Sequence, residues 1–155
     1  MKQIPQIIVP IVDNGSMVNE NLFDILENKK TIIFGVPGAF TPTCSEQHLP
    51  GFLKLSEKIK SKGVDGIYCL SVNDKFVMKS WLLTYSDGNE IKGIADGNAE
   101  VSKALDMISD KSSSFMGLRS KRFAMIVENN YIIKTFVDIS GEFLKTSAEN
   151  ILKYL

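Results

Sequence analysis

The fold of this chain is constrained most by one continuous apolar run, Thr31-Ile32-Ile33-Phe34-Gly35-Val36. A strand with one solvated face alternates apolar and polar side chains, whereas this run is apolar at nearly every position, which indicates burial on both faces. A helical stretch separates it from a second buried strand, Ile67-Tyr68-Cys69-Leu70-Ser71-Val72. Strands connected in this way pair in parallel through a right-handed crossover. We therefore expect a sheet with helices on both faces.

The remaining segments extend this pattern in both directions. Asn14-Gly15, between two apolar stretches, predicts a tight hairpin ahead of the first buried strand. A helix is predicted from Pro42 to about Ser61 with a kink at Pro50, and Asp74 is placed to cap the next helix. Later elements are expected at 91–95 (strand), 99–107 (helix), 123–127 and 131–137 (strands) and 148–155 (helix). This order predicts a single α/β domain over residues 1–155, a thioredoxin-like fold in which helices flank a central mixed β-sheet and an N-terminal β-hairpin extends it.

Charge and composition exclude several classes of protein. Lys+Arg and Asp+Glu are equal at 18 each, so no net charge favours nucleic acid or an anionic membrane surface. No apolar run approaches the roughly 18 residues that span a bilayer, and the apolar stretch from Ile7 to Val12 lacks the basic flank of a signal peptide. The two cysteines, Cys44 and Cys69, fit neither a disulfide framework nor a zinc site. We expect a cytoplasmic protein without a bound metal.

Cys44 lies where the fold would activate a thiol. It follows the first buried strand in the segment Val36–Ser45, at the first turn of the predicted helix. Unpaired N–H groups and the positive end of the helix dipole stabilise a thiolate at such a position, and the thiolate is the reactive form of cysteine. The alternative is a buried, unreactive cysteine. The prolines, glycine and threonines that crowd this junction favour a functional site.

The residues around Cys44 resemble the active-site signature of a known family. Pro37, Thr41 and Cys44 fill the pattern Pro-x-x-x-Thr-x-x-Cys of the peroxiredoxins. The continuation to Phe52 resembles the subfamily called peroxiredoxin-five in animals and type II in plants. Further matches follow in order, at Ser71–Met78 with Trp81, at Ala95–Glu100 and at Arg119–Val127. The resemblance therefore covers nearly the whole chain.

This resemblance implies a thiol-dependent peroxidase that reduces hydrogen peroxide and alkyl hydroperoxides. Cys44 would attack the O–O bond and become a sulfenic acid, and the Thr41 hydroxyl would contact the peroxide. Arg122 would supply a fixed positive charge, with Arg119 as the competing candidate, and Pro37 would shield the sulfur. Residues expected to contact the substrate are Gly38, Phe40, Thr43 and Phe115, with Met116 beside them.

The resemblance also bears on how the oxidised cysteine is reduced. Some members of the subfamily carry a resolving cysteine near the C-terminus, but this chain has none after Cys69, and Ser147 is the nearest residue in size. Cys69 itself lies in a buried strand and is expected to be inert. The resemblance thus implies a one-cysteine mechanism, reduction by glutathione with glutaredoxin or by thioredoxin, and a homodimer. No dinucleotide or phosphate-binding motif is present, so no cofactor is expected.

Two other functions fit parts of the sequence. His48, the only histidine, follows Cys44 by four residues and shares its helical face, as in a Cys–His thioester hydrolase or acyltransferase. A noncatalytic thioredoxin-fold interaction module is the third possibility. A peroxide-consumption assay identifies the peroxidase. The hydrolase should instead turn over thioesters and depend on His48, and the interaction module should do neither.

Overall fold

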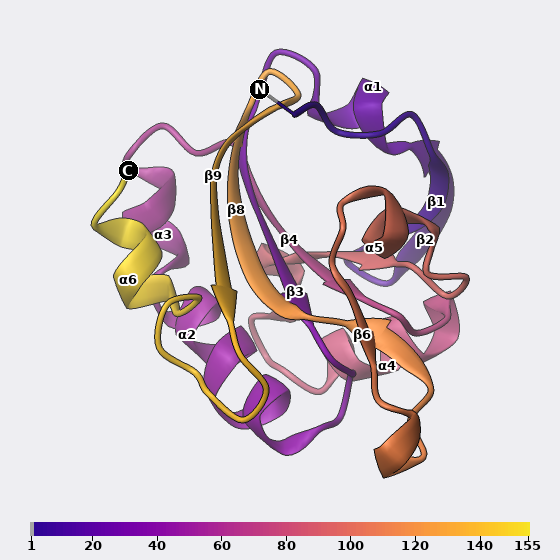
Figure 1. Cartoon of the computed structure of the whole chain (residues 1–155). Helices are drawn as coiled ribbons and strands as arrows, with labels where there is room; N and C mark the ends of the chain where they lie inside the picture. The colour runs from indigo at the N-terminus through magenta and orange to yellow at the C-terminus, as the bar shows by residue number, and fades with distance from the viewer. Residues whose placement is uncertain (1) are drawn as a thin grey trace.

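The computed structural model describes residues 2–155, which form a mixed sheet with helices on both faces (Figure 1). The strands are β1 (Ile8–Asp13), β2 (Ser16–Asn21), β3 (Lys30–Val36), β4 (Gly66–Ser71), β5 (Lys92–Ala95), β6 (Ile108–Asp110), β7 (Leu118–Ser120), β8 (Arg122–Glu128) and β9 (Tyr131–Asp138). The helices are α1 (Leu22–Leu26), α2 (Leu49–Lys54), α3 (Ser56–Lys60), α4 (Lys75–Leu83), α5 (Glu100–Ala104) and α6 (Ala148–Leu152). A π turn, η1 (Cys44–His48), and two 3-10 turns, η2 (Gly88–Glu90) and η3 (Ser112–Ser114), complete the set.

The main sheet has seven strands in the order β2-β1-β5-β4-β3-β8-β9. The central strands β3, β4 and β5 are parallel, as predicted for the two buried runs, and the outer pairs are antiparallel. The register between β3 and β8 pairs Gly35 with Phe123. The beginning of β8 therefore lies beside the end of β3, where the chain turns toward Cys44.

Successive side chains of β3 point to opposite faces and enter two separate apolar clusters. Ile32 and Phe34 pack beneath α2, α3, α4 and α6, whereas Ile33 packs beneath α1 and α5. Figure 1 shows α2, α3 and α6 on one side of the sheet and α1 and α5 on the other. Burial of β3 on both faces confirms the α/β arrangement expected from its continuous apolar sequence.

Local signals in the sequence correspond to local structure. Asn14 and Gly15 have φ of 49° and 83° and connect β1 to β2, as the left-handed turn of a tight hairpin requires. The Asp74 side chain accepts hydrogen bonds from the backbone N–H groups of Phe76 and Val77, which confirms the predicted cap of α4. No helix within residues 2–155 combines the length and the apolar character needed to cross a membrane.

The structure differs from the prediction at three helices. The helix expected near 99–107 ends at Ala104, because Asp106 adopts a left-handed conformation with φ of 59°, and the chain continues into β6. The last helix ends at Leu152 instead of residue 155. The long helix expected from Pro42 is interrupted at Leu55. It also contains the π turn Cys44–His48, which ends two residues before Pro50, where a kink was expected.

Candidate active site

The sulfur of Cys44 is buried and in contact with a guanidinium group. Cys44 is 0% exposed, and Nη2 of Arg122 donates to its Sγ at 3.1 Å. Arg122 is the first residue of β8, so the pairing of β8 with β3 brings it to the helix start that follows β3. A permanent positive charge at this distance stabilises the thiolate relative to the thiol.

A second contact fixes the other side of the Arg122 guanidinium. Its Nη1 lies 2.8 Å from Nδ1 of His48, and Nε2 of His48 lies 2.9 Å from the carbonyl oxygen of Thr146. Arginine can only donate, so Nδ1 must accept. The proton of the neutral ring is therefore on Nε2 and is donated to Thr146.

The protonation state of His48 agrees with this assignment. Burial, followed by the charge of Arg122, lowers the pKa of His48 from 6.5 to about 3, so the ring is neutral at physiological pH. Both ring nitrogens are engaged, with Arg122 and with Thr146, and neither remains for the sulfur. This geometry does not fit a Cys–His hydrolase, in which the histidine takes the thiol proton.

The π turn that carries Cys44 is held from the side by α4 and the residues after it. The backbone N–H of Leu49 donates to the carbonyl of Cys44, five residues earlier, and Pro50 has no N–H to offer the carbonyl of Ser45. The hydroxyl of Tyr85 donates to that Ser45 carbonyl at 2.6 Å, and Nε1 of Trp81 donates to the Ser45 hydroxyl at 2.9 Å.

The loop between β3 and the π turn is braced by the end of β4. The backbone N–H of Ala39 donates to Oδ1 of Asn73 at 3.0 Å, and the Ser71 hydroxyl bonds the same oxygen. The Thr41 hydroxyl donates to the carbonyl of Gly38 at 2.6 Å, which leaves its oxygen free to accept. Asn73 belongs to the segment Ser71–Met78, which resembles the family, but no sequence pattern indicated that its side chain contacts this loop.

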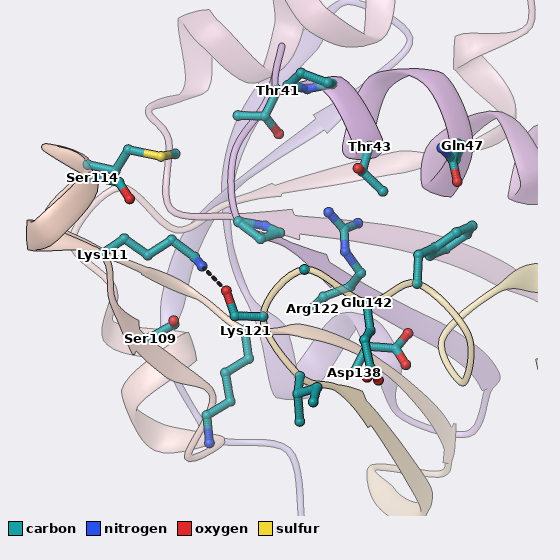
Figure 2. Close-up of a pocket in the computed structure, with 17 residues that line it drawn as sticks. Thr41, Thr43, Gln47, Ser109, Lys111, Ser114, Lys121, Arg122, Asp138 and Glu142 are labelled. Carbon is teal, nitrogen blue, oxygen red and sulfur yellow. Dashed lines mark hydrogen bonds between the residues drawn. The ribbon is translucent and has the colours of Figure 1, made fainter.

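A cavity of about 600 Å³ opens beside Arg122 and is shown in Figure 2. Its walls come from three parts of the chain: Pro37, Thr41, Pro42, Thr43 and Gln47; Ser109, Lys111, Ser114, Met116, Lys121 and Arg122; and residues 138–143. Cys44 does not line it, but the Arg122 guanidinium both lines the cavity and touches the sulfur. The cavity thus lies next to the arginine that contacts the thiol.

The remaining residues expected at the site are spread around it. Phe40 is 56% exposed with φ of 64°, and a side chain at Gly38 would meet Thr41 and Arg119. Arg119 donates to the carbonyls of Met116 at 2.9 Å and Val72 at 3.3 Å, and has no bond to the sulfur. Phe115 is 98% exposed and does not line the cavity, because a left-handed turn at φ of 61° directs it outward.

The segment that follows β9 also contributes residues that were not predicted from the sequence. Phe143 places its ring 5.8 Å from Cζ of Arg122, and Thr146 and Asp138 hold the segment to which it belongs. They lie far from Cys44 in the sequence, and no sequence pattern indicated that they contact the site. In residues 2–155, His, Cys, Asp and Glu side chains do not gather in groups of three or more that could hold a metal ion.

The chain matches known proteins along nearly its whole length. The redoxin family model matches residues 9–152. Peroxiredoxin-2D of Arabidopsis thaliana is 46% identical over 143 residues, which are 92% of this chain and 88% of that protein. The crystal structure of reduced Prx3 from Vibrio vulnificus in complex with hydrogen peroxide has a TM-score of 0.92 and 40% identity, and covers 99% of this chain and 96% of that one.

A further similar structure is that of the Plasmodium falciparum antioxidant protein, described as a 1-Cys peroxiredoxin. Its TM-score is 0.89 at 33% identity, over 99% of this chain and 95% of that one. These matches confirm the thioredoxin-like fold predicted from the sequence. The chain belongs to the redoxin family and, within it, to the peroxiredoxins of the type II or peroxiredoxin-five subfamily, which makes it a thiol-dependent peroxidase.

Proposed function

We propose that Cys44 is the peroxidatic nucleophile of a one-cysteine mechanism that uses an external thiol as reductant. The observation that carries the proposal is the contact of Arg122 Nη2 with the Cys44 sulfur at 3.1 Å. A charge held at the sulfur favours the thiolate, and the same guanidinium faces the cavity through which a peroxide would arrive.

In the first step the Cys44 thiolate attacks one oxygen of a hydroperoxide. An S–O bond forms, the O–O bond breaks, and the leaving oxygen takes up a proton to become water or an alcohol. Arg122 offsets the developing negative charge, and a backbone N–H at the helix start can donate to the oxygen under attack. The free lone pairs of the Thr41 hydroxyl can accept from the peroxide O–H. Cys44 is left as a sulfenic acid.

Access to these groups is controlled by the loop that precedes the helix. Pro37 and Thr43 line the cavity next to Thr41, in keeping with Pro37 as a shield and Thr43 as a substrate contact. The lack of a side chain at Gly38 leaves room for Thr41, because a Cβ at Gly38 would lie 3.1 Å from Thr41 Cγ2 and would displace the Thr41 hydroxyl. Phe40 belongs to this loop and exposes its side chain to solvent.

In the second step a free thiol attacks the sulfenic sulfur, water leaves, and a mixed disulfide forms. A second thiol then releases Cys44 and leaves as the disulfide of the reductant. The candidates are glutathione with glutaredoxin, or thioredoxin. Cys69 is a poor resolving residue because it is 0% exposed within β4 and burial raises the pKa of its thiol well above the ordinary value.

We also propose a homodimer that works in the cytoplasm, where thiol reductants are available. Phe115 is 98% exposed beside the site and would be covered by a partner subunit. Sedimentation of the purified chain tests the first part, with a monomer at all concentrations as the contrary result. Fractionation of the source cells tests the second, and recovery of the protein outside the cytoplasm would contradict it.

The one-cysteine mechanism is tested with Cys69→Ser. Turnover with glutathione and glutaredoxin should be nearly unchanged, and stoichiometric peroxide should give Cys44 as sulfenic acid or, with glutathione, as a mixed disulfide. Mass spectrometry distinguishes these products. A dominant Cys44–Cys69 disulfide, with turnover lost in Cys69→Ser, would show that Cys69 resolves Cys44. Parallel assays with thioredoxin identify the reductant.

A further inference from the structure

Asp138 ends β9 with a buried carboxylate that binds the segment leading to α6. It is 4% exposed, and its Oδ1 accepts from the backbone N–H of Lys145 at 2.9 Å. Its Oδ2 accepts from the N–H groups of Leu144 and Thr146 at 3.0 and 3.1 Å, and from the Thr146 hydroxyl at 2.7 Å. Burial alone would raise the pKa of Asp138, but these hydrogen bonds outweigh it and lower the pKa. The carboxylate is therefore charged and fully engaged.

Thr146 joins this carboxylate to the thiol site. The residue that gives its N–H and hydroxyl to Asp138 offers its carbonyl to Nε2 of His48 at 2.9 Å. His48 in turn accepts from Arg122, whose other amino group donates to Cys44. A continuous set of contacts thus runs from Asp138 to the sulfur.

The same segment contacts the middle of this set a second time. The ring of Phe143 lies 5.1 Å from the His48 ring, centre to centre, and 5.8 Å from Cζ of Arg122. The segment therefore holds His48 through a carbonyl and covers both His48 and Arg122 with an aromatic face. Displacement of the segment would release both groups together.

We propose that Asp138 is a positioning residue for Cys44. Its carboxylate holds residues 143–147 so that Thr146 fixes the tautomer of His48, and His48 fixes Arg122 against the sulfur. The inference rests on the proposed function, in which Arg122 stabilises the reactive thiolate. Asp138 has no bond to Cys44, so it positions the sulfur's partner through Thr146, His48 and Arg122. Loss of its negative charge alone would favour the thiolate, so a shift against the thiolate in a variant reports the loss of positioning.

The test measures the ultraviolet absorbance of the thiolate against pH in a Cys69→Ser background, where Cys44 is the only thiol. Asp138→Asn keeps the side-chain shape but replaces one acceptor oxygen with a donor, so it cannot satisfy the same N–H groups. We expect the thiolate absorbance to appear only at higher pH than in the parent protein. Peroxide reduction should slow on the order of tenfold, because the guanidinium is no longer held in place.

This titration uses no peroxide, so its result is independent of the proposed peroxidase cycle. A thiolate titration that is unchanged in Asp138→Asn contradicts the positioning role. Absence of peroxide reduction in the parent protein contradicts the proposed function. The two failures are therefore distinguishable.

Asp96 provides a matched control. Its carboxylate is 2% exposed and accepts from the backbone N–H groups of Val101 and Ser102 and from the Ser102 hydroxyl. Asp96→Asn weakens an equivalent anchor at the start of α5, on the opposite face of the sheet. It should lower the free energy of unfolding and leave the Cys44 titration unchanged. Equal titration shifts in both aspartate variants would mean that general destabilisation explains the effect, which overturns the proposal.

Two further variants test whether the effect of Asp138 on Cys44 passes through Thr146 and His48. In a His48→Leu background, Asp138→Asn should add only a small further shift, because the Phe143 contact with Arg122 is then the one connection that remains. Thr146→Val keeps the carbonyl but loses the hydroxyl bond to Asp138, and should give a smaller shift in the same direction. The proposal is overturned by a full additional shift in the His48→Leu background. It is overturned equally by unchanged titrations in Asp138→Asn and Thr146→Val.

Discussion

The hydroxyl of Tyr85 donates to the carbonyl oxygen of Ser45 at 2.6 Å, one residue after Cys44. In the π turn this carbonyl would be paired with the N–H of residue 50, which is a proline and has none. The tyrosine thus supplies from outside the helix the donor that the helix lacks. This contact ties the position of Cys44 to the segment after α4.

Removal of that donor should destabilise the protein measurably. Tyr85→Phe leaves the Ser45 carbonyl without its hydrogen bond, and we expect the free energy of unfolding to fall by about 1 kcal/mol. Urea denaturation followed by the fluorescence of Trp81, the only tryptophan, measures it. Tyr131→Phe is the control, since Tyr131 is 41% exposed on β9 and its loss of a hydroxyl should have little effect. Equal losses in the two variants would contradict this role of Tyr85.

His48 should give the protein a characteristic loss of stability toward acid. Its pKa is about 3 in the folded chain and has the ordinary value of 6.5 when unfolded, so between these values only the unfolded chain binds the proton. The free energy of unfolding should therefore fall as the pH decreases below about 6.5, by up to about 1.4 kcal/mol per pH unit. His48→Leu lacks this proton, and its stability should change less between about pH 6 and pH 5. Urea titrations of both proteins at several pH values decide the matter, and parallel profiles would refute the assignment.

The two neighbouring arginines should differ in their effect on the thiol. Arg122→Met removes the charge from the sulfur, so the thiolate should form only at higher pH and peroxide reduction should slow by roughly 10²-fold or more. Arg119→Met breaks contacts to the Met116 and Val72 carbonyls and should reduce the rate much less. The pH dependence of alkylation at Cys44, read by mass spectrometry, compares them. If Arg119→Met produced the larger change, the two assignments would have to be exchanged.

Thr41 is expected to contribute through its hydroxyl alone. Thr41→Val preserves the shape of the side chain but removes both the bond to the Gly38 carbonyl and the lone pairs offered to the peroxide. The loss of one preorganised polar contact typically reduces a rate on the order of 10²–10³-fold. Thr43→Val is a matched control on the same wall of the cavity and should cost less. An unchanged peroxide rate in Thr41→Val would remove Thr41 from the mechanism.

Those parts of the fold that depend on neighbouring residues could be predicted from the sequence. The Asn14-Gly15 hairpin and the Asp74 cap are each set by a few adjacent side chains. The β6–β7 pair was missed because its strands are short and lack a periodic apolar pattern, so that only their pairing defines them. The helix expected to reach residue 107 ends before Asp106, which has a left-handed backbone conformation. The neighbouring residues did not indicate that conformation.

Prediction of the site followed the same division. Cys44 was assigned from the strand before it, the helix after it and the family resemblance, and Arg122 was preferred to Arg119 from that resemblance. The contact of Arg122 with the sulfur depends on the pairing of β8 with β3, which the sequence does not show. The partner of His48 could not be inferred, because Thr146 lies 98 residues away and contributes a backbone carbonyl, which carries no sequence signature. Phe115 was expected at the cavity from the family resemblance, yet its own turn directs it into solvent.

The most direct measurement is stopped-flow reduction of hydrogen peroxide by the prereduced protein and by its Cys44→Ser variant. The parent protein should consume one equivalent of peroxide rapidly without added reductant, because each thiolate forms one sulfenic acid. Cys44→Ser should show no such phase, while Cys69→Ser should behave like the parent. Rapid peroxide reduction that survives in Cys44→Ser would contradict the assignment of Cys44 as the peroxidatic nucleophile.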